Sequence, residues 1–217
     1  MDNPVLTLRP ESPADYRAVE ALTREAFWNH HVPGCDEHYL AHTLRQHEAF
    51  VPELCFVAEE AGTLVGSVMY AKAHIALDAG GRMPVLTFGP LSVLPARQRQ
   101  GIGKRLVQHT RTLAAAMGYA AILIYGDPAI YRRMGFVPAE RYGIATADNL
   151  YHDALQAFAL QAGALDGAAG RFVEGDAYAV DAEAAAAFDS QFPIREKREG
   201  LPSQLRFLET LRMHRPR

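Results

Sequence analysis

The sequence predicts an α/β protein built on a twisted, mixed β-sheet that is flanked by helices, with a helical extension at its C-terminal end. Along the chain, segments with the alternating apolar pattern of strands alternate with segments of helical periodicity. Residues 120–125 are continuously apolar, which is typical of a parallel strand buried on both faces. Because 49% of the 217 residues are hydrophobic, the chain can bury a full core.

The N-terminal part predicts one strand followed by two helices. Residues 5–9 have the β-branched and alternating pattern of a short strand. Ser12 is a favourable N-cap, and Pro13 fits the first helical position, where a missing N–H group breaks no hydrogen bond. After the break at residues 33–34, residues 36–46 have a second helical pattern.

The next segment predicts antiparallel strands. Residues 54–77 are compatible with two strands joined by a turn at residues 60–62, which makes a hairpin. Residues 84–95 form a further strand that Gly89 and Pro90 interrupt. Because proline cannot donate a hydrogen bond to a neighbouring strand, we expect a bulge or an unpaired edge there.

A strand–helix–strand unit follows. Apolar residues at positions 102, 106, 113 and 117 lie on one helical face, and Gly118 is suited to end the helix. With strand 120–125, this spacing predicts a parallel crossover. The segment "RQRQGIGKRL", residues 97–106, therefore lies where the first strand ends and the helix begins. Ligands of open parallel sheets bind at that edge.

This segment predicts a phosphate or pyrophosphate site. The first turn of a helix exposes unpaired N–H groups and the positive end of the helix dipole, so it attracts anions. Gly101 and Gly103 remove side chains that would keep an oxygen-rich ligand away from those groups. Four cationic side chains add positive charge around it, namely Arg97, Arg99, Lys104 and Arg105.

The spacing separates three kinds of phosphate loop. A Walker loop needs Ser or Thr after its lysine and an earlier glycine, but Arg105 and Gln98 occupy those positions. A dinucleotide fingerprint needs Gly or Ala at position 106, which is Leu106. The pattern Gln98-x-x-Gly101-x-Gly103 after a strand fits the third kind residue for residue.

That pattern resembles the pyrophosphate loop, [QR]-x-x-G-x-[GA], of the GNAT superfamily of acyl-CoA-dependent N-acetyltransferases. A second segment, "GDPAIYRRMGF" at residues 126–136, has the tyrosine four residues before Gly-Phe that lies near the acyl-CoA sulfur in this family. Together with "GPLSVLP", it looks most like the bacterial YhbS-like branch. The resemblance covers roughly residues 5–160, so we expect a GNAT-like domain over residues 1–160 and an extension over 161–217.

The resemblance implies acetyl-CoA as the acyl donor, with no metal. It implies that the strand before the loop, the loop itself and the start of the tyrosine helix contact the cofactor. These residues are Leu91, Ser92, Val93, Gln98, Arg99, Gln100, Gly101, Ile102, Gly103, Lys104 and Asp127.

The chemistry of amine acetylation suggests roles for further residues. An alkylammonium with a pKa near 10.4 must lose a proton before it attacks a thioester, so a base is needed. Glu53, His74 and Asp127 are the candidates, and we expect Glu53 to be the base. Tyr131 stays protonated and can donate to the leaving thiolate. Both substrates can react directly in a ternary complex, without a covalent enzyme intermediate.

The loop between the first two helices is the candidate acceptor side. Such loops line the acceptor in the resembling family, so we expect Trp28, Asn29 and His31 to contact the substrate, with surface packing as the alternative. His38 and His42 have half of a metal-site spacing but lack further ligands, so we expect them to face solvent.

Charge and composition limit the partners. The net charge of −3 gives no general attraction to nucleic acid or acidic membranes. No leader pattern or long apolar run is present, and the two cysteines fit reduced thiols, so we expect a cytoplasmic protein. Residues 195–217 hold seven Lys or Arg and three Glu, which indicates a solvated basic tail. The apolar side of residues 201–214 suits covering the sheet, closing the acceptor cleft or forming a homodimer.

The leading interpretation is therefore an N-acetyltransferase that acts on a primary amine. A non-catalytic module that binds acyl-CoA and reports it through the C-terminal helices is the alternative. A nucleotide-dependent oxidoreductase is a weaker third hypothesis.

Overall fold

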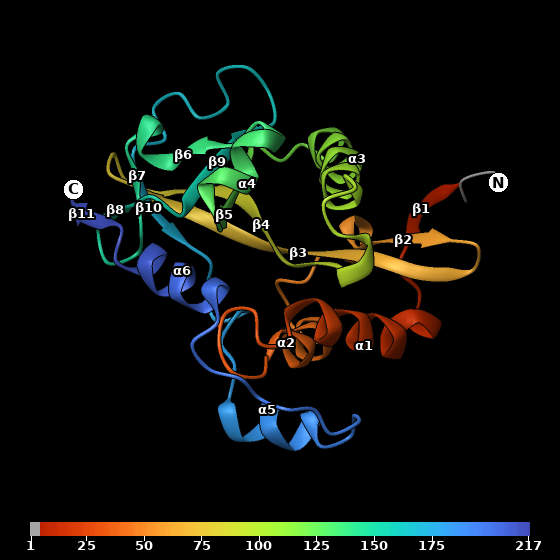
Figure 1. The fold of residues 1–217 in the computed structure, drawn as a ribbon. Helices are drawn as coiled ribbons and strands as arrows, with labels where there is room; N and C mark the ends of the chain where they lie inside the picture. The colour runs from red at the N-terminus through yellow and green to blue at the C-terminus, as the bar shows by residue number, and fades with distance from the viewer. Residues whose placement is uncertain (1–4) are drawn as a thin grey trace.

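The computed structural model describes residues 5–217, so the first four residues of the expected domain lie outside it. Its strands are β1 Leu6–Pro10, β2 Phe56–Glu60, β3 Thr63–Leu77, β4 Arg82–Val93, β5 Ala121–Tyr125, β6 Val137–Pro138, β7 Ile144–Ala145, β8 Leu150–His152, β9 Leu155–Ala159, β10 Gly170–Val173 and β11 His214–Pro216. Its α-helices are α1 Tyr16–Phe27, α2 Glu37–Leu44, α3 Ile102–Ala116, α4 Pro128–Tyr131, α5 Ala182–Asp189 and α6 Pro202–Leu211 (Figure 1).

The main sheet is mixed, which confirms the predicted fold class. Its strands follow the order β1-β2-β3-β4-β5-β9-β6, and β10 pairs with β3 and β7. The pairs β4–β5 and β7–β10 are parallel, whereas the others are antiparallel. A second, small sheet joins β8 to β11.

Turn residues fix the predicted hairpin between β2 and β3 and a second hairpin between β3 and β4. Ala61 and Gly62 both have positive φ between β2 and β3, and so do Gly80 and Gly81 between β3 and β4. This backbone hand matches the twist of the adjoining strands, so the turns set the register of the long antiparallel pairs. The predicted hairpin around residues 60–62 is confirmed.

β4 departs from its parallel neighbour along half of its length. It pairs with β3 from end to end, but with β5 only at Leu86 and Ile122. The register against β3 shifts where Gly89 and Pro90 lie, which confirms the predicted bulge. From residue 87 to Val93, about 20 Å of strand edge therefore faces a gap instead of a strand.

Helices cover both faces of the sheet. α3 packs on one face through residues that include Ile102, Leu106 and Val107, and the hydroxyl groups of Tyr70 and Thr110 hydrogen-bond beneath it at 2.8 Å. α1 and α2 cover the opposite face (Figure 1). Met117 is 44% exposed, because it follows the last helical residue, so its predicted place on the apolar face is wrong.

The start of α1 also differs from the prediction. Pro13–Asp15 form a 3₁₀ turn before the α-helix begins at Tyr16. The carboxylate of Asp15 accepts a 2.8 Å hydrogen bond from the Ser12 backbone N–H, and it also pairs with Arg9. These contacts hold the chain at the end of β1 and orient α1 across the sheet.

The C-terminal part contains the two predicted helices, α5 and α6, but it also supplies β10 to the main sheet. The sheet therefore extends beyond residue 160. Most of residues 195–217 are exposed, which agrees with the predicted solvated basic tail, but the tail is held in place: Arg215 and Arg217 form ion pairs with Glu140 and Asp78, and β11 pairs with β8. None of the helices in residues 5–217 combines the length and apolar character that a membrane crossing needs.

The apolar side of α6 remains free in the monomer. Leu205, Leu208 and Leu211 are each about half exposed. Pairing of two subunits through this helix stays a prediction.

Candidate functional site

The start of α3 presents a row of unpaired backbone N–H groups. Gly101 is the N-cap, with a left-handed φ of 85°, and Arg99 also has positive φ. The first bond of the helix runs from the Arg105 N–H to the Gly101 carbonyl, at 3.0 Å. Within residues 5–217, the N–H groups of residues 99–104 donate to no other group. They converge as an anion-binding turn would require.

Side chains hold this turn in place. The Gln98 amide donates to the Val93 carbonyl at 3.1 Å, which ties the loop to the end of β4. Arg97 donates to Gln100 and forms an ion pair with Glu60, which is 7% exposed. The guanidinium of Arg97 is thus paired within the protein. The prediction that it adds positive charge around the ligand is wrong.

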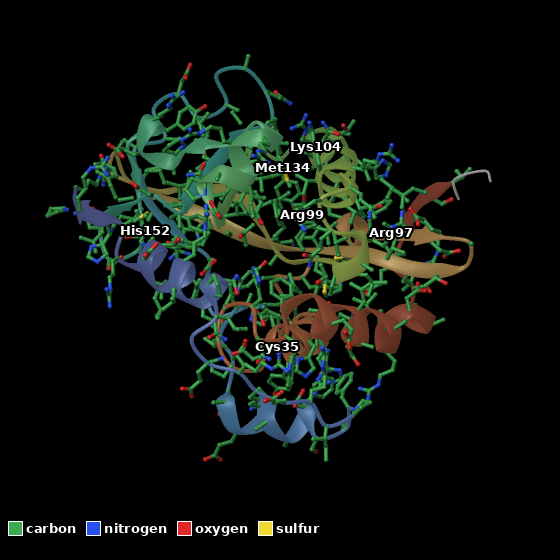
Figure 2. The ribbon with its side chains drawn as sticks, viewed as in Figure 1. Cys35, Arg97, Arg99, Lys104, Met134 and His152 are labelled. Atoms are coloured by element: carbon green, nitrogen blue, oxygen red, sulfur yellow. The ribbon has the colours of Figure 1, made fainter. Side chains whose placement is uncertain are left out.

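Three other cations remain near the turn. Arg99, Lys104 and Arg105 are exposed, and they form no ion pair with the part of the chain that the structure describes. Figure 2 shows Arg97, Arg99 and Lys104 around the beginning of α3. A Cβ atom at Gly103 would meet only Leu91 and Val93, at ordinary contact distances of 3.6 and 3.7 Å. Packing beneath the turn therefore does not require glycine at position 103. Its effect is to leave the outer side of the turn open to a ligand.

The end of β4 leads from this turn into the gap beside β5. Leu91 and Val93 are half-buried, whereas Ser92 is buried and its hydroxyl donates to Thr23 of α1 at 2.9 Å. The side chain of Ser92 is thus used in packing, and its contribution to a ligand comes from the backbone. The free backbone edge of these residues can hydrogen-bond to an extended amide-containing ligand.

Tyr131 lies across the same gap, at the end of α4. Its ring packs against Phe88 and Phe136, with ring centroids 5.9 and 5.7 Å away. It also covers Gly126, where a Cβ atom would lie only 2.1 Å from the ring. The Tyr131 hydroxyl makes no hydrogen bond with any residue from 5 to 217. Burial, with a smaller effect from Asp127, raises the pKa of Tyr131 to about 12, so the phenol is protonated at neutral pH.

Asp127 holds the start of the tyrosine helix. One carboxylate oxygen accepts the Ala129 N–H at 2.8 Å as an N-cap, and the other pairs with Arg206 of α6 at 2.8 Å. Both oxygens of Asp127 are thus engaged. This makes Asp127 a structural residue beside Tyr131 and argues against it as the base.

The other two predicted bases lie away from Tyr131. Glu53 is exposed in a 3₁₀ turn and lies near Tyr119, beyond the C-terminal end of α3. His74 is paired with Pro84 near the beginning of β4, about 13 Å along the strand from Phe88. Among residues 5–217, neither Glu53 nor His74 forms a hydrogen bond or ion pair with Tyr131, and the assignment of Glu53 as the base stays a prediction.

The α1–α2 loop is joined to the C-terminal extension. Asn29 is 8% exposed; its side chain accepts from Gly34 and Arg198 and donates to Glu196. The side chain of Asn29 thus has a structural role, and its predicted substrate contact stays a prediction. Trp28 lies beside a surface hollow of about 400 Å³ that Arg195 and Arg198 also line.

α6 connects this loop to the tyrosine helix. The ring of His31 stacks on Phe207 with a centroid distance of 4.6 Å, and the Gln204 amide donates to the Asn29 carbonyl at 3.2 Å. Arg206 of the same helix pairs with Asp127. The extension thus links the two walls between which an acceptor would enter.

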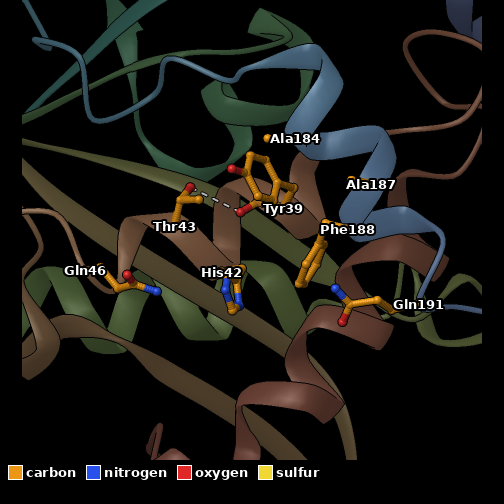
Figure 3. Close-up of a pocket in the computed structure, with 8 residues that line it drawn as sticks. All are labelled: Tyr39, His42, Thr43, Gln46, Ala184, Ala187, Phe188 and Gln191. Carbon is orange, nitrogen blue, oxygen red and sulfur yellow. Dashed lines mark hydrogen bonds between the residues drawn. The ribbon is translucent and has the colours of Figure 1, made fainter.

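A second hollow of about 400 Å³ lies apart from this region, between α2 and α5 (Figure 3). Tyr39 and His42 line it from α2, and Phe188 lines it from α5. His38, one turn before His42, is fully buried, 3.1 Å from Asp189, so its predicted solvent-facing position is wrong. No cluster of three metal-ligating side chains occurs within residues 5–217.

The sequence interpretation missed residues 174–178, which follow β10. Tyr178 packs against the bulge of β4, where a Cβ atom at Gly89 would lie 3.3 Å from its ring. Glu174 directly follows β10 and is half-buried; burial, with a smaller effect from Glu174, raises the pKa of both Tyr125 and Tyr178. No local motif marks these residues, since only the pairing of β10 with β3 brings them to the gap.

Comparisons with known proteins agree with this geometry. The family model described as "Acetyltransferase (GNAT) domain" matches residues 52–138, which include the β4 edge, the anion-binding turn and Tyr131. Residues 52–138 are thus similar to a GNAT acetyltransferase domain. The sequence resemblance to this superfamily is thereby confirmed.

Relatives of the GNAT domain include uncharacterised and structurally known proteins. The chain is 27% identical to the uncharacterized N-acetyltransferase YhbS of Escherichia coli K12, over 76% of this chain and 93% of that protein. The crystal structure of YhbS from Escherichia coli in complex with CoA has a TM-score of 0.72 at 26% identity, over 82% of this chain and 94% of that one. A GNAT family acetyltransferase from Brucella melitensis in complex with acetyl-CoA has a TM-score of 0.63 at 25% identity, over 81% and 99%.

Proposed function

We propose that this protein transfers an acetyl group from acetyl-CoA to a primary amine while both substrates are bound, with Tyr131 as the general acid. The observation that carries the proposal is one continuous path. It begins at the unpaired N–H groups of residues 99–104, follows the free edge of β4 and ends at the unpartnered Tyr131 hydroxyl. The two similar structures with CoA and acetyl-CoA support the same ligand.

The path accounts for the parts of an acyl-CoA molecule. N–H groups of residues 99–104, with Arg99 and Lys104, would bind the diphosphate, and Gln98 would hold the turn open. The backbone of residues 91–93 would hydrogen-bond to the pantetheine arm. The thioester would then lie beside Phe88 and Tyr131.

Tyr131 suits proton donation to the leaving thiolate. Negative charge develops on the departing sulfur as the C–S bond breaks, so the sulfur can accept a hydrogen bond from a well-placed phenol, which stabilises that charge and supplies its proton. The raised pKa keeps the phenol protonated until that moment. Because the Tyr131 hydroxyl forms no hydrogen bond with residues 5–217, it is available to the sulfur.

The acceptor would enter between α4 and the α1–α2 loop, where Trp28 and His31 remain our proposed substrate contacts. Its entry there would leave the α3 side to the cofactor. We expect the protein to act in the cytoplasm.

The test is acetyl-CoA turnover with a panel of primary amines, amino acids and peptides, in the wild type and in Tyr131→Phe. We expect the variant to lose about 10²-fold or more in kcat while the Kd for CoA stays within about twofold. Tight acetyl-CoA binding without turnover of any amine would favour the non-catalytic sensor. Binding of NAD(P) without CoA would favour an oxidoreductase.

A further inference from the structure

The helix that carries Tyr131 is a single turn whose backbone N–H groups all donate to Asp127. α4 is only four residues long, which is too short to be stable by itself. The Asp127 carbonyl accepts the N–H groups of Ile130 and Tyr131, at 3.0 and 3.1 Å, and its carboxylate accepts that of Ala129, at 2.8 Å. The first residue of α4 is a proline, which has no N–H group. The position of Tyr131 therefore follows the position of Asp127.

Arg206 of α6 holds the side chain of Asp127 from outside this turn. Its guanidinium pairs with Oδ2 of Asp127 at 2.8 Å, whereas Oδ1 is the oxygen that accepts the Ala129 N–H. Among residues 5–217, Asp127 forms an ion pair with no other cation. Contacts at both oxygens prevent the carboxylate from rotating, so Arg206 fixes the orientation in which Asp127 caps α4.

The place of Arg206 is set in turn by contacts of α6 with the α1–α2 loop. No side chain of α6 belongs to the three hydrophobic clusters of residues 5–217. Gln204, which is 5% exposed, instead donates to the Asn29 carbonyl at 3.2 Å, and the Phe207 ring stacks on His31 with a centroid distance of 4.6 Å. Positions 204, 206 and 207 lie within about one helical turn, so a single turn of α6 joins the loop to α4.

We propose that Arg206 is a positioning residue for the general acid: it holds Asp127 and thereby sets the place of the Tyr131 hydroxyl. This rests on the proposed function, which makes Tyr131 the acid. Phe88 and Phe136 pack against the phenol ring, whereas the backbone that carries the ring is set by the cap at Asp127. The C-terminal extension thus contributes to catalysis without touching a substrate.

The Arg206–Asp127 ion pair is exposed, so it adds little to the stability of the whole protein. The side chain of Arg206 is 62% exposed and that of Asp127 is 25% exposed. Pairs of this kind contribute little to the free energy of unfolding, because water and salt screen them. A positioning role therefore predicts that loss of the pair changes kcat and leaves the Tm almost unchanged.

The test compares Arg206→Gln with Arg212→Gln, the same change at the exposed C-cap of α6, where the arginine forms no ion pair with residues 5–217. We expect Arg206→Gln to lower kcat about tenfold, which is less than the roughly 10²-fold cost of a 1 Å displacement because the ring packing remains. The KM for the amine and the Kd for CoA should stay within about twofold. Arg212→Gln should match the wild type.

A conservative variant and a double variant test how Arg206 acts. Because the ion pair is made through one nitrogen, Arg206→Lys should restore most of kcat. In Arg206→Gln/Tyr131→Phe, kcat should be no lower than in Tyr131→Phe alone, since the acid that Arg206 positions is absent.

Amide hydrogen exchange reports the cap without any turnover. The N–H groups of residues 129–131 all donate to Asp127. They should exchange about tenfold faster in Arg206→Gln than in Arg212→Gln, because a looser cap lets the turn open more often.

The outcomes separate this proposal from the proposed function. Wild-type kcat and exchange rates in Arg206→Gln, beside a strongly impaired Tyr131→Phe, would overturn the positioning role and leave the general acid intact. A raised KM for the amine, or losses that multiply in the double variant, would also overturn it, since Arg206 would then act on the substrate itself. Full activity of Tyr131→Phe would overturn the proposed general acid, and the positioning role with it, even where exchange at residues 129–131 responds.

Discussion

Gly126→Ala tests whether the placement of the Tyr131 ring controls catalysis. A Cβ atom at position 126 would lie 2.1 Å from the ring, whereas unbonded carbon atoms rest about 3.5 Å apart. To restore a contact of about 3.5 Å from 2.1 Å, the ring must move by about 1.4 Å, and because Phe88 and Phe136 pack against it, it must move toward the open gap. A displacement of this size at a reacting group costs about 10²-fold in rate. We therefore expect kcat to fall about 10²-fold.

The assay is steady-state release of CoA thiol, with the Kd for CoA and the Tm measured beside it. CoA affinity should change little, because the diphosphate turn at residues 99–104 lies on a different element. The double variant Gly126→Ala/Tyr131→Phe provides the decisive comparison. If the added methyl group acts only by displacing the hydroxyl, the double variant should be no slower than the slower single variant.

Two results would refute this reasoning. Near-wild-type kcat in Gly126→Ala would show that the ring position is not critical. Losses that multiply in the double variant would show that residue 126 acts on the reaction by a route other than Tyr131.

The remaining predictions concern CoA binding at residues 99–104, the rate at alkaline pH and the free energy of unfolding at acid pH. Gly101→Ala should raise the Kd for CoA about tenfold, a cost of about 1.4 kcal/mol, whereas Gly80→Ala, at a similar positive φ in a distant hairpin, should cost only stability. The wild-type rate should not fall on the alkaline side up to about pH 10, because the pKa of Tyr131 is about 12; a loss with a midpoint near pH 9 would contradict this. Burial lowers the pKa of His38, so the unfolded chain takes up its proton first and the free energy of unfolding should decline as the pH falls below about 6.5; His38→Gln should flatten that decline in urea titrations.

The turn and the tyrosine helix could be predicted from sequence because their determinants are local. Gly101 acts through its own φ, and the amides that follow it are unpaired for the same reason at the start of any helix. The spacing of Tyr131 and Gly135 likewise lies within one short helix and its end, where Gly135 has positive φ. Short-range rules are sufficient for such features.

The acceptor side depends on contacts between distant parts of the chain. Tyr178 reaches the bulge of β4 only after β10 has paired with β3, almost 100 residues earlier in the chain. Asn29 forms hydrogen bonds with Glu196 and Arg198. The α1–α2 loop, whose sequence suggests a free recognition segment, is therefore held in place by the C-terminal extension. The place of Glu53 relative to Tyr131 likewise follows from the order of strands and not from any motif.

The free edge of β4 has a consequence for the behaviour of the purified protein. Backbone groups along about 20 Å of strand are ready to accept a neighbour, and an isolated chain offers them to any extended peptide, including another copy of itself. An amide-rich ligand laid there would act as a surrogate strand. The purified protein should therefore aggregate less and have a higher Tm when coenzyme is present. Both effects should grow with the fraction of protein that has coenzyme bound.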